Sequence, residues 1–368
     1  MGAMTGNLVI DLSAVRCNYA ILDSLSAQSC ETAAAVKANA YGLGIGPIAN
    51  TLQEAGCRTF FVATVEEAIE LRAAIGKAGA IAVLHGYDPT YETEYRKFDL
   101  IPVLNSLNQI AEYRKAAGKG ETQRRAILHF DTGMNRIGIE GKEDEKLNQN
   151  KDLLTGLEIV LIISHFISSE EDSPLNPLQH EIFIKIAKAY KGVRRSICNS
   201  SGIFRSKEYH LDLTRPGMAL YGLNPQPGKA NPMRPVVNLT VPVLQVRDAQ
   251  AGETAGYNAT HRFNKKTTLA VAALGYADGF FRSLGNRSAL YWKGRPLPIR
   301  GRVSMDLVIC DLENLPEKDW PTPGDALEVL GPNQSADDLA AAAGTIGYEI
   351  LTALGKRYKR HYKKKLQP

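Results

Sequence analysis

The stretch TFFVATVEEAIELRAAIGKAGAIAVLHG, residues 59–86, contains two short apolar runs with a helical pattern between them. The runs TFFVA (59–63) and AIAVLHG (80–86) have the length and composition of buried strands. In the segment between them, glutamate and lysine occupy one helical face, and alanine, isoleucine and leucine the other. Two strands joined by a helix run parallel, so this stretch predicts one strand–helix–strand unit of a parallel sheet.

The same alternation of strand and helix extends over most of the chain on both sides of this unit. Runs with the composition of buried strands lie at 33–38, 59–63, 80–86, 100–105, 125–131, 157–166, 194–201 and 210–217. Eight strands that alternate with helices are what a (β/α)8 TIM-type barrel requires. We therefore predict an α/β fold with a barrel domain over residues 5–234, although the first strand, about 5–11, can instead join the second domain.

From residue 235 the pattern changes to strands in which apolar and polar residues alternate, separated by Gly/Pro turns. Such runs lie at 236–248, 267–279 and 288–312. They predict a C-terminal, mostly antiparallel β-domain over residues 235–368. The last helix is expected at residues 337–357, DDLAAAAGTIGYEILTALGKR.

The composition narrows the classes of protein to consider. The chain has 368 residues, of which 44% are hydrophobic and 23% charged, as in an ordinary globular protein. No apolar stretch approaches the roughly 18 residues of a membrane span and no secretory signal is recognisable, so we expect a cytoplasmic protein without membrane contact. The five cysteines form no C-x-x-C pair, which favours reduced thiols over disulfides or a metal site.

Much of the net charge of +5 lies in KRYKRHYKKK, residues 356–365. A basic run of this kind can bind nucleic acid or an anionic surface. No nucleic-acid recognition module accompanies it, so we interpret it as a helix end that frays into a solvated tail, and expect no nucleic-acid partner.

Polar side chains follow the predicted strands at their carboxyl ends, where barrel enzymes carry catalytic groups. In strand order these residues are Lys37, Tyr41, His129, Arg136, His165, Asn199, Ser200, Arg215, Gly217 and Met218. Considered without the other residues, Lys37 is interpreted as a surface lysine at a strand end. Together with the rest of the rim, it reads as a lysine that forms a Schiff base with a carbonyl group.

The loops after the last two barrel strands suggest which carbonyl compound this is. Barrels frequently bind a phosphate with these loops, and here they offer a serine hydroxyl and the amides of a glycine-containing turn. A phosphate site and a reactive lysine together indicate pyridoxal 5′-phosphate. The glycine-rich GLGIG (42–46) lacks the spacing of a dinucleotide site, and no G-x-S-x-G elbow supports a hydrolase.

Eight segments resemble bacterial alanine racemase, and they occur in the family's order over nearly the whole chain. They are AVKANAYGLG, DTGMNRIG, NSSGIF, RPGMALYGL, AGYNATHR, LGYADGF, GRVSMDL and IGYEIL. The resemblance implies a pyridoxal-phosphate enzyme with a barrel, a C-terminal β-domain and a head-to-tail homodimer with shared active sites. It also implies interconversion of L-alanine and D-alanine for cell-wall peptidoglycan.

The resemblance assigns roles to individual residues. Lys37 becomes the Schiff-base lysine and one catalytic base, and Tyr257 the second base, contributed across the dimer to the other face of the cofactor. Arg215 is expected beside the pyridine nitrogen. We expect cofactor contacts from Lys37, Tyr41, His165, Asn199, Ser200, Arg215, Gly217, Met218 and Tyr348. Substrate contacts are expected from Arg136, Met305 and Tyr276, and no metal is expected.

Other functions stay open from the sequence. A racemase for serine or for a broader set of amino acids would use the same residues, and a biosynthetic role is not separated from a catabolic one. A decarboxylase of this fold type carries an acidic residue where this chain has Arg215, which disfavours that reading. A non-catalytic pyridoxal-phosphate carrier would lack the second domain.

One position departs from the family's pattern. Many members have a lysine where this chain has His129, and that lysine is often carbamylated, so that its negative charge holds the residue corresponding to Arg136. An imidazole forms no stable carbamate and is mostly uncharged at neutral pH. We expect that a neutral His129 accepts a hydrogen bond from Arg136, that a bound anion such as chloride supplies the charge, or that other neighbours hold Arg136.

Overall fold

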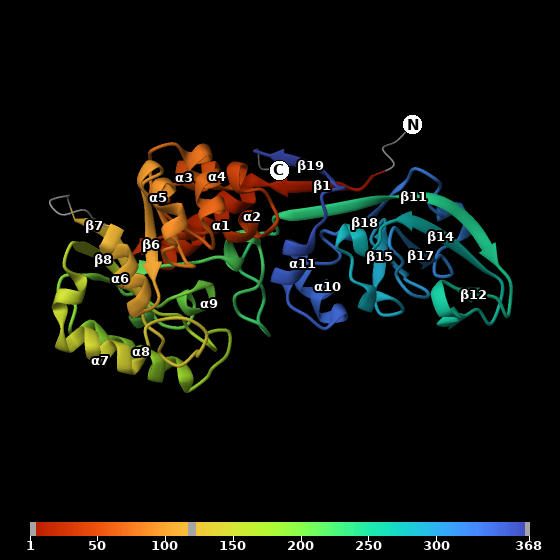
Figure 1. Ribbon diagram of the computed structural model, residues 1–368. Coiled ribbons are helices and arrows are strands. Elements are labelled where there is room, and N and C mark those ends of the chain that lie inside the picture. Colours follow the sequence, from red (N-terminus) through yellow and green to blue (C-terminus); the bar gives the residue numbers. More distant parts are fainter. Residues whose placement is uncertain (1–4, 117–122, 365–368) are drawn as a thin grey trace. The chain divides into compact units, whose positions relative to one another are not determined.

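The computed structural model describes residues 5–116 and 123–364 and divides into two compact units. One unit is Val15–Arg234, and the other joins the chain up to Ala14 with the chain from Pro235 onward. In Figure 1 the red strand near the N-terminus accordingly lies beside the blue strand near the C-terminus.

The first unit is built on parallel strands. A seven-stranded sheet runs in the order β3-β4-β5-β6-β7-β8-β9, and β10 pairs in parallel with β2. The bounds are β2 (Glu31–Thr32), β3 (Ala34–Ala35), β4 (Thr59–Val62), β5 (Ala80–Val83), β6 (Leu100–Leu104), β7 (Arg124–His129), β8 (Leu157–Ile163), β9 (Arg194–Ser196) and β10 (Leu213–Thr214).

Hydrogen bonds between the first and last strands close the ring. Strand β2 continues into β3 after Ala33, whose N–H donates to the carbonyl of Thr214 at 2.9 Å. On the other side of β10, the Arg215 N–H donates to the carbonyl of Cys198 at 2.9 Å. The predicted (β/α)8 barrel is thereby confirmed. Each predicted run contains a strand, but several strands are shorter than predicted, and residues 37–38 and 200–201 lie in short helices.

The barrel interior is filled by apolar side chains that point inward from successive strands. This core consists of Ala33, Phe61, Ala82, Ile101, Val103, Ile127, Leu161, Ile163 and Leu213, all of which are buried. Burial of such side chains contributes about 1.5–3 kcal/mol for each large residue. The interior is therefore a packed core, and chemistry is confined to the ends of the strands.

Helices connect the strands, and two of them, α4 and α9, begin at a residue whose side chain caps the helix. In α4, for example, Thr64 is the N-cap and accepts from the N–H of Glu67, with acidic residues in the first turn. The helices up to the end of this unit are α1 (Leu12–Leu25), α2 (Lys37–Tyr41), α3 (Ile45–Glu54), α4 (Val65–Ile75), α5 (Glu92–Lys97), α6 (Leu107–Ala116), α7 (Gly141–Gln149), α8 (Leu175–Ala187) and α9 (Ser200–Ile203).

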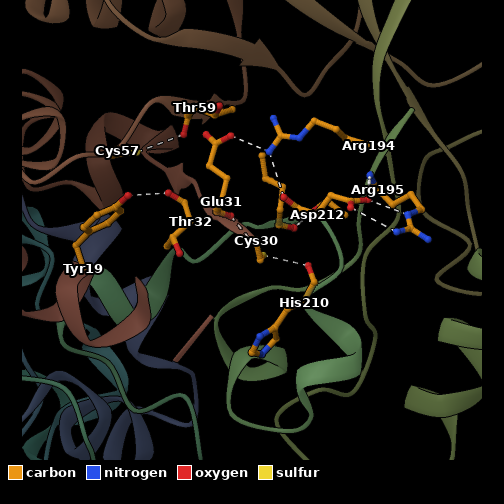
Figure 2. A network of polar contacts seen from close by, with 12 residues as sticks. Tyr19, Cys30, Glu31, Thr32, Cys57, Thr59, Arg194, Arg195, His210 and Asp212 are labelled. Carbon is orange, nitrogen blue, oxygen red and sulfur yellow. Dashed lines mark hydrogen bonds and ion pairs between the residues drawn. The ribbon is translucent and has the colours of Figure 1, made fainter. Parts of the chain in front are cut away.

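A polar network ties the amino ends of the closing strands together (Figure 2). Arg194 on β9 donates to the Glu31 carboxylate on β2 at 2.7 Å. Its neighbour Arg195 pairs with Asp212 at 2.8 Å, and the Asp212 carbonyl accepts from the N–H of Glu31 at 3.1 Å. Residues at this end of a barrel serve stability, so we assign the network to closure of the ring.

The second unit contains an eight-stranded, mostly antiparallel sheet, as predicted. Its order is β16-β15-β18-β11-β1-β19, while β14 pairs with β11 and β17. A two-stranded ribbon, β12 (Thr254–Ala255) with β13 (His261–Arg262), accompanies it. The bounds are β1 (Asn7–Asp11), β11 (Val237–Ala249), β14 (Thr267–Ala273), β15 (Ala289–Trp292), β16 (Arg295–Pro298), β17 (Leu307–Asp311), β18 (Ala326–Leu330), β19 (Lys359–Lys363), α10 (Ala336–Ala343) and α11 (Gly347–Ala353).

Two expectations for the end of the chain are wrong. The predicted last helix is two helices, because Gly344 takes the left-handed conformation (φ 79°) and ends α10 before α11 begins. The basic run is not a fraying helix end, since β19 pairs in parallel with β1 and half-buries Arg360 and Tyr362. Lys365, the last residue of the run, lies outside the described residues.

Candidate active site

The carboxyl ends of the barrel strands bring several of the predicted residues into one electrostatic environment. The charge of Arg136 lowers the pKa of Lys37, and the pKa of His165 responds to Arg215, Arg136 and Lys37. Such mutual effects require short separations. Side chains from the loops after β3, β7, β8 and β10 therefore lie near one another at the barrel mouth.

Lys37 is followed by a left-handed turn. Ala38, Asn39, Ala40 and Tyr41 have φ values of 53°, 54°, 52° and 55°. For non-glycine residues this conformation costs roughly 1–2 kcal/mol each, so surrounding contacts must stabilise it. One of them is Glu67, whose two carboxylate oxygens accept from the N–H groups of Ala38 (2.6 Å) and Ala63 (2.8 Å).

The surroundings of Lys37 make its amine less basic. Burial, and then the charge of Arg136, lower the pKa of Lys37 below its ordinary value, while the Glu67 carboxylate opposes this shift. Removing an ammonium from water disfavours its charged form. Lys37 therefore releases its proton, and becomes nucleophilic, more readily than a surface lysine does.

A small polar cradle joins the loops after β3, β9 and β10. The Ser200 hydroxyl oxygen accepts from the N–H groups of Gly217 (2.9 Å) and Ala219 (3.3 Å). A Cβ at Gly217 would lie 2.4 Å from the hydroxyl oxygen of Tyr41, so only glycine leaves this space open. Met218 begins a buried 3-10 turn directly after the cradle.

Asn199 precedes Ser200 and fixes the backbone beside the cradle. Its side-chain oxygen accepts from the N–H of Gly202 at 3.0 Å, as the N-cap of α9, and from the Ser169 hydroxyl at 2.7 Å. Hydroxyl groups and backbone N–H groups are suited to a phosphate. The cradle thus fits a phosphate monoester, with Asn199 as a positioning residue.

Arg215 is a buried cation held by uncharged oxygen atoms. Its guanidinium donates to the Ser196 hydroxyl and to the carbonyl of Ser164, and it lies 5.8 Å from the centre of the Phe61 ring. Within the described residues no carboxylate pairs with it. Burial lowers the pKa of Arg215 to about 10, which leaves the group charged at neutral pH.

The two histidines of the mouth are neutral at physiological pH. Burial, followed by the charge of Arg215, holds the pKa of His165 well below its usual range. The same two causes lower the pKa of His129 to about 4. The mouth therefore carries the positive charge of Arg136 and Arg215, which suits anionic groups.

Arg136 lies in a loop that folds back onto the end of β7. The Asp131 carboxylate accepts from the N–H groups of Gly133 (2.7 Å), Met134 (2.8 Å) and Arg136 (3.3 Å). The side chain of Arg136 is exposed. Its predicted partner His129 makes a hydrogen bond elsewhere: its Nδ1 lies 2.8 Å from Oδ1 of Asn105.

The remaining predicted site residues belong to the second unit. Tyr257 is 68% exposed in a 3-10 turn and lines a cavity of about 820 Å³ together with Arg302. Tyr276 and Met305 are adjacent, because the N–H of Tyr276 donates to Ser304 O (3.1 Å) and that of Ala277 to Met305 O (3.0 Å). Tyr348, in α11, is half-buried.

Two residues of the barrel mouth, Glu67 and Asn105, were not predicted from the sequence. Glu67 lies on a helix in an ordinary run of acidic residues, and Asn105 follows β6 outside every motif. A search of each strand's end for polar residues would have found Asn105, because the strand stops at Leu104. Nothing local distinguishes Glu67 from the neighbouring Glu66.

Among the described residues no helix has the length and apolar character needed to cross a membrane. The described part of the chain also holds no disulfide, since Cys17, Cys30, Cys57, Cys198 and Cys310 are all free.

Comparison with known proteins assigns the family. The model of the alanine racemase N-terminal domain matches residues 10–225, and that of the C-terminal domain matches residues 236–362. An alanine racemase from Acidiphilium cryptum is 46% identical over 354 residues, which is 96% of this chain and 97% of the relative. A catabolic alanine racemase from Agrobacterium fabrum is 45% identical over 362 residues, which is 98% of this chain and 93% of the relative.

Solved structures agree with this assignment. The crystal structure of alanine racemase from Bartonella henselae with covalently bound pyridoxal phosphate superposes with a TM-score of 0.94 at 39% identity, covering 98% of this chain and 100% of that one. The biosynthetic alanine racemase from Pseudomonas aeruginosa superposes with a TM-score of 0.91 at 30% identity, with the same coverage. The chain therefore belongs to the alanine racemase family, the isomerases that interconvert L-alanine and D-alanine.

Proposed function

We propose that this protein uses pyridoxal 5′-phosphate to interconvert L-alanine and D-alanine, with Lys37 and Tyr257 as the two proton-transferring groups. The observation that carries the proposal is a lysine of lowered pKa in a barrel mouth that also holds Arg215 without a carboxylate partner among the described residues. Family membership and the cofactor named for the Bartonella henselae relative support it.

The residues of the mouth fit the cofactor. Its phosphate would bind to the hydroxyls of Tyr41 and Ser200 and to the backbone at Gly217 and Met218, where a Cβ would fill the space at Gly217. Tyr348 would complete this contact set, and Lys37 would bond to the cofactor's aldehyde carbon. When bound, pyridoxal phosphate withdraws electrons from the Cα of an attached amino acid and so acidifies its Cα–H bond.

Arg215 would lie beside the pyridine nitrogen, with His165 as its neighbour. A carboxylate at this position would keep that nitrogen protonated and favour extensive delocalisation of charge. A guanidinium cannot accept a proton, and its pKa of about 10 leaves it charged. This environment favours a brief loss of the Cα proton over transamination or decarboxylation.

Racemisation removes a proton from one face of Cα and returns one to the other, so it needs two acid/base groups. Lys37 is suited to one face because its burial favours the neutral amine. Tyr257 is suited to the other because its exposed side chain is available to a second molecule. We propose that it acts in the active site of the partner subunit of a homodimer, and that the cavity beside it receives that partner.

The substrate carboxylate would bind to the Arg136 guanidinium and the backbone N–H of Met305. Tyr276 lies next to Met305 and, with Tyr348, would limit the pocket to a small side chain. This restriction favours alanine over serine and larger substrates. We place the enzyme in the cytoplasm, in the supply of D-alanine for peptidoglycan, which the free cysteines of the described residues support.

Racemisation rates over a panel of L-amino acids test the proposed reaction. We expect the cofactor-loaded protein to convert L-alanine at least tenfold faster than L-serine, since the pocket rejects the larger and more polar side chain by about 1–3 kcal/mol. Equal rates would favour the broad-specificity alternative. Absence of Cα proton exchange with every substrate would favour a non-catalytic carrier.

Borohydride reduction followed by peptide mapping tests the assignment of the lysine. We expect the pyridoxyl group on Lys37, and none in the Lys37→Arg protein. A label on any other lysine would contradict the site.

A further inference from the structure

His129 ends β7 and is 8% exposed, with its Nδ1 2.8 Å from Oδ1 of Asn105, which is 5% exposed. The hydrogen bonds of Asn105 decide which atom donates. Its amide nitrogen donates to the carbonyls of Leu84 (3.0 Å) and Val103 (2.7 Å), so both amide protons are used. Rotating the amide would press its oxygen against two carbonyl oxygens, so the orientation is determined.

The oxygen of Asn105 therefore accepts, and Nδ1 of His129 carries the proton. Because the pKa of His129 is about 4, the ring is neutral at physiological pH and Nε2 keeps its lone pair. Within the described residues Nε2 has no hydrogen-bond partner. Asn105 thus turns His129 into a fixed acceptor.

The guanidinium of Arg136, in the loop after β7, is a hydrogen-bond donor that contacts no acceptor among the described residues. The segment after β7 folds back so that the N–H of Ile139 donates to the carbonyl of His129 at 2.7 Å, and that of Asp131 to the carbonyl of Ile139 at 3.1 Å. Arg136 lies between these two anchor points. Its guanidinium makes no hydrogen bond to a described residue, and its charge acts on the pKa of His129.

We propose that Asn105 holds His129 as the tautomer with a bare Nε2, and that this nitrogen accepts a hydrogen bond from Arg136 and positions it for the substrate carboxylate. The inference rests on the proposed function, in which Arg136 binds that carboxylate. Asn105 and His129 are positioning residues. A lone pair at Nε2 repels an anion, so chloride has no part in this arrangement.

The tautomer is measured without reference to activity. In enzyme labelled with 15N-histidine, the His129 signals are identified by their absence from the His129→Gln protein. We expect a protonated Nδ1 and a bare Nε2 at neutral pH. A protonated Nε2 would overturn the proposal, even in an enzyme that racemises alanine.

A titratable neighbour provides the second test. In Asn105→Asp, a carboxylate beside Nδ1 raises the pKa of His129, so that at lower pH Nε2 becomes a donor and repels Arg136. The other charged groups that act on His129 are Arg215, Arg136 and Asp131. We expect the ratio of the variant's KM for L-alanine to that of the wild type to rise about tenfold from pH 9 to pH 6.

The double variant Asn105→Asp/His129→Gln isolates the imidazole. Glutamine does not titrate, so we expect its KM ratio to be independent of pH. A ratio that is equally flat in Asn105→Asp alone would reduce Asn105 to a structural role and overturn the proposal.

The third test removes the proposed acceptor, Nε2 of His129. We expect His129→Leu to raise KM about tenfold with a smaller change in kcat, and His129→Gln, which keeps an acceptor oxygen, to stay within about threefold of the wild type.

The matched control is His210→Leu, which removes another buried histidine whose Nε2 lies 3.0 Å from the Ile203 carbonyl oxygen. Its KM should not change. Equal KM in His129→Leu and the wild type, or a wild-type KM that falls when chloride is added, would overturn the inference.

Discussion

Arg215 keeps its charge in the barrel mouth, while the two histidines there are neutral. Burial, followed by the charge of Arg215, lowers the pKa of both His129 and His165, and burial with the charge of Arg136 lowers that of Lys37. The phosphate and the carboxylate of the proposed function would therefore enter a region of positive charge. The charge of individual arginines thus favours anionic ligands at this site.

The depressed pKa of His129 predicts an acid-sensitive stability. The unfolded chain binds a proton at His129 near pH 6.5, while the folded chain resists it down to about pH 4. Between these values the unfolded state holds more protons, so folding stability falls as the pH falls, by about 1.4 kcal/mol per pH unit. In urea unfolding of the apoprotein this contribution adds to those of the other histidines of lowered pKa, so it is measured as a difference from a variant without His129.

The matched comparison is the His129→Gln protein. Its stability deficit relative to the wild type should shrink by about the same amount per pH unit between pH 6 and pH 4.5. Parallel stability curves for the two proteins would contradict the depressed pKa.

Replacement of the proposed second base should affect the two reaction directions differently. In Tyr257→Phe we expect kcat to fall by about 100-fold or more, since a positioned acid/base group contributes 10²–10⁴-fold. Removal of the Cα proton from L-alanine should be impaired more directly than from D-alanine, with Lys37 serving the D side. Substrate deuterium isotope effects measured in both directions test this, and equal effects would argue against face-specific bases.

Among the elements, the left-handed turn of α2 best illustrates how packing overrides local preference. Nothing in KANAY favours four successive residues with φ above 50°, and in isolation the alanines would form an ordinary right-handed helix. Two side-chain contacts oppose that preference, one from a distant residue and one from within the turn. Glu67 binds the N–H of Ala38, and the Asn39 side chain accepts from the N–H of Ile45 at 2.8 Å.

The cradle for the phosphate should be sensitive to one added methyl group. In Gly217→Ala the new Cβ would lie 2.4 Å from the Tyr41 hydroxyl oxygen, so that side chain must move. We expect affinity for pyridoxal phosphate to fall about tenfold and the apoprotein to lose about 1–3 kcal/mol of stability. Fluorescence titration of the apoprotein measures the first effect.

Gly141→Ala is the control, because a Cβ there meets no atom within 4 Å. Its affinity for the cofactor should equal that of the wild type. An unchanged affinity in Gly217→Ala would remove this glycine from the cradle.

At the scale of the whole molecule, the proposed dimer divides each active site between two chains. Lys37 lies in one unit and Tyr257 in the other, so a Lys37→Ala chain and a Tyr257→Phe chain each lack one base. A mixed dimer would contain one site with both bases and one with neither. Re-equilibrated mixtures should recover up to about a quarter of wild-type activity, by the statistics of random pairing.

The parents alone, mixed without re-equilibration, serve as the control and should stay inactive. Mixtures that remain as inactive as the parents would contradict the shared site.

The sequence by itself predicted the barrel and the antiparallel domain, which the structure confirms, and it also predicted the residues of the proposed site. It could do so because these depend on local patterns: alternation of strand and helix, and polar residues placed directly after strands. Only the tertiary structure decided the turn after Lys37, the pairing of β19 with β1, and the link from Asn105 to His129. Each of these joins segments far apart in the chain, and their stability comes from contacts that no local pattern records.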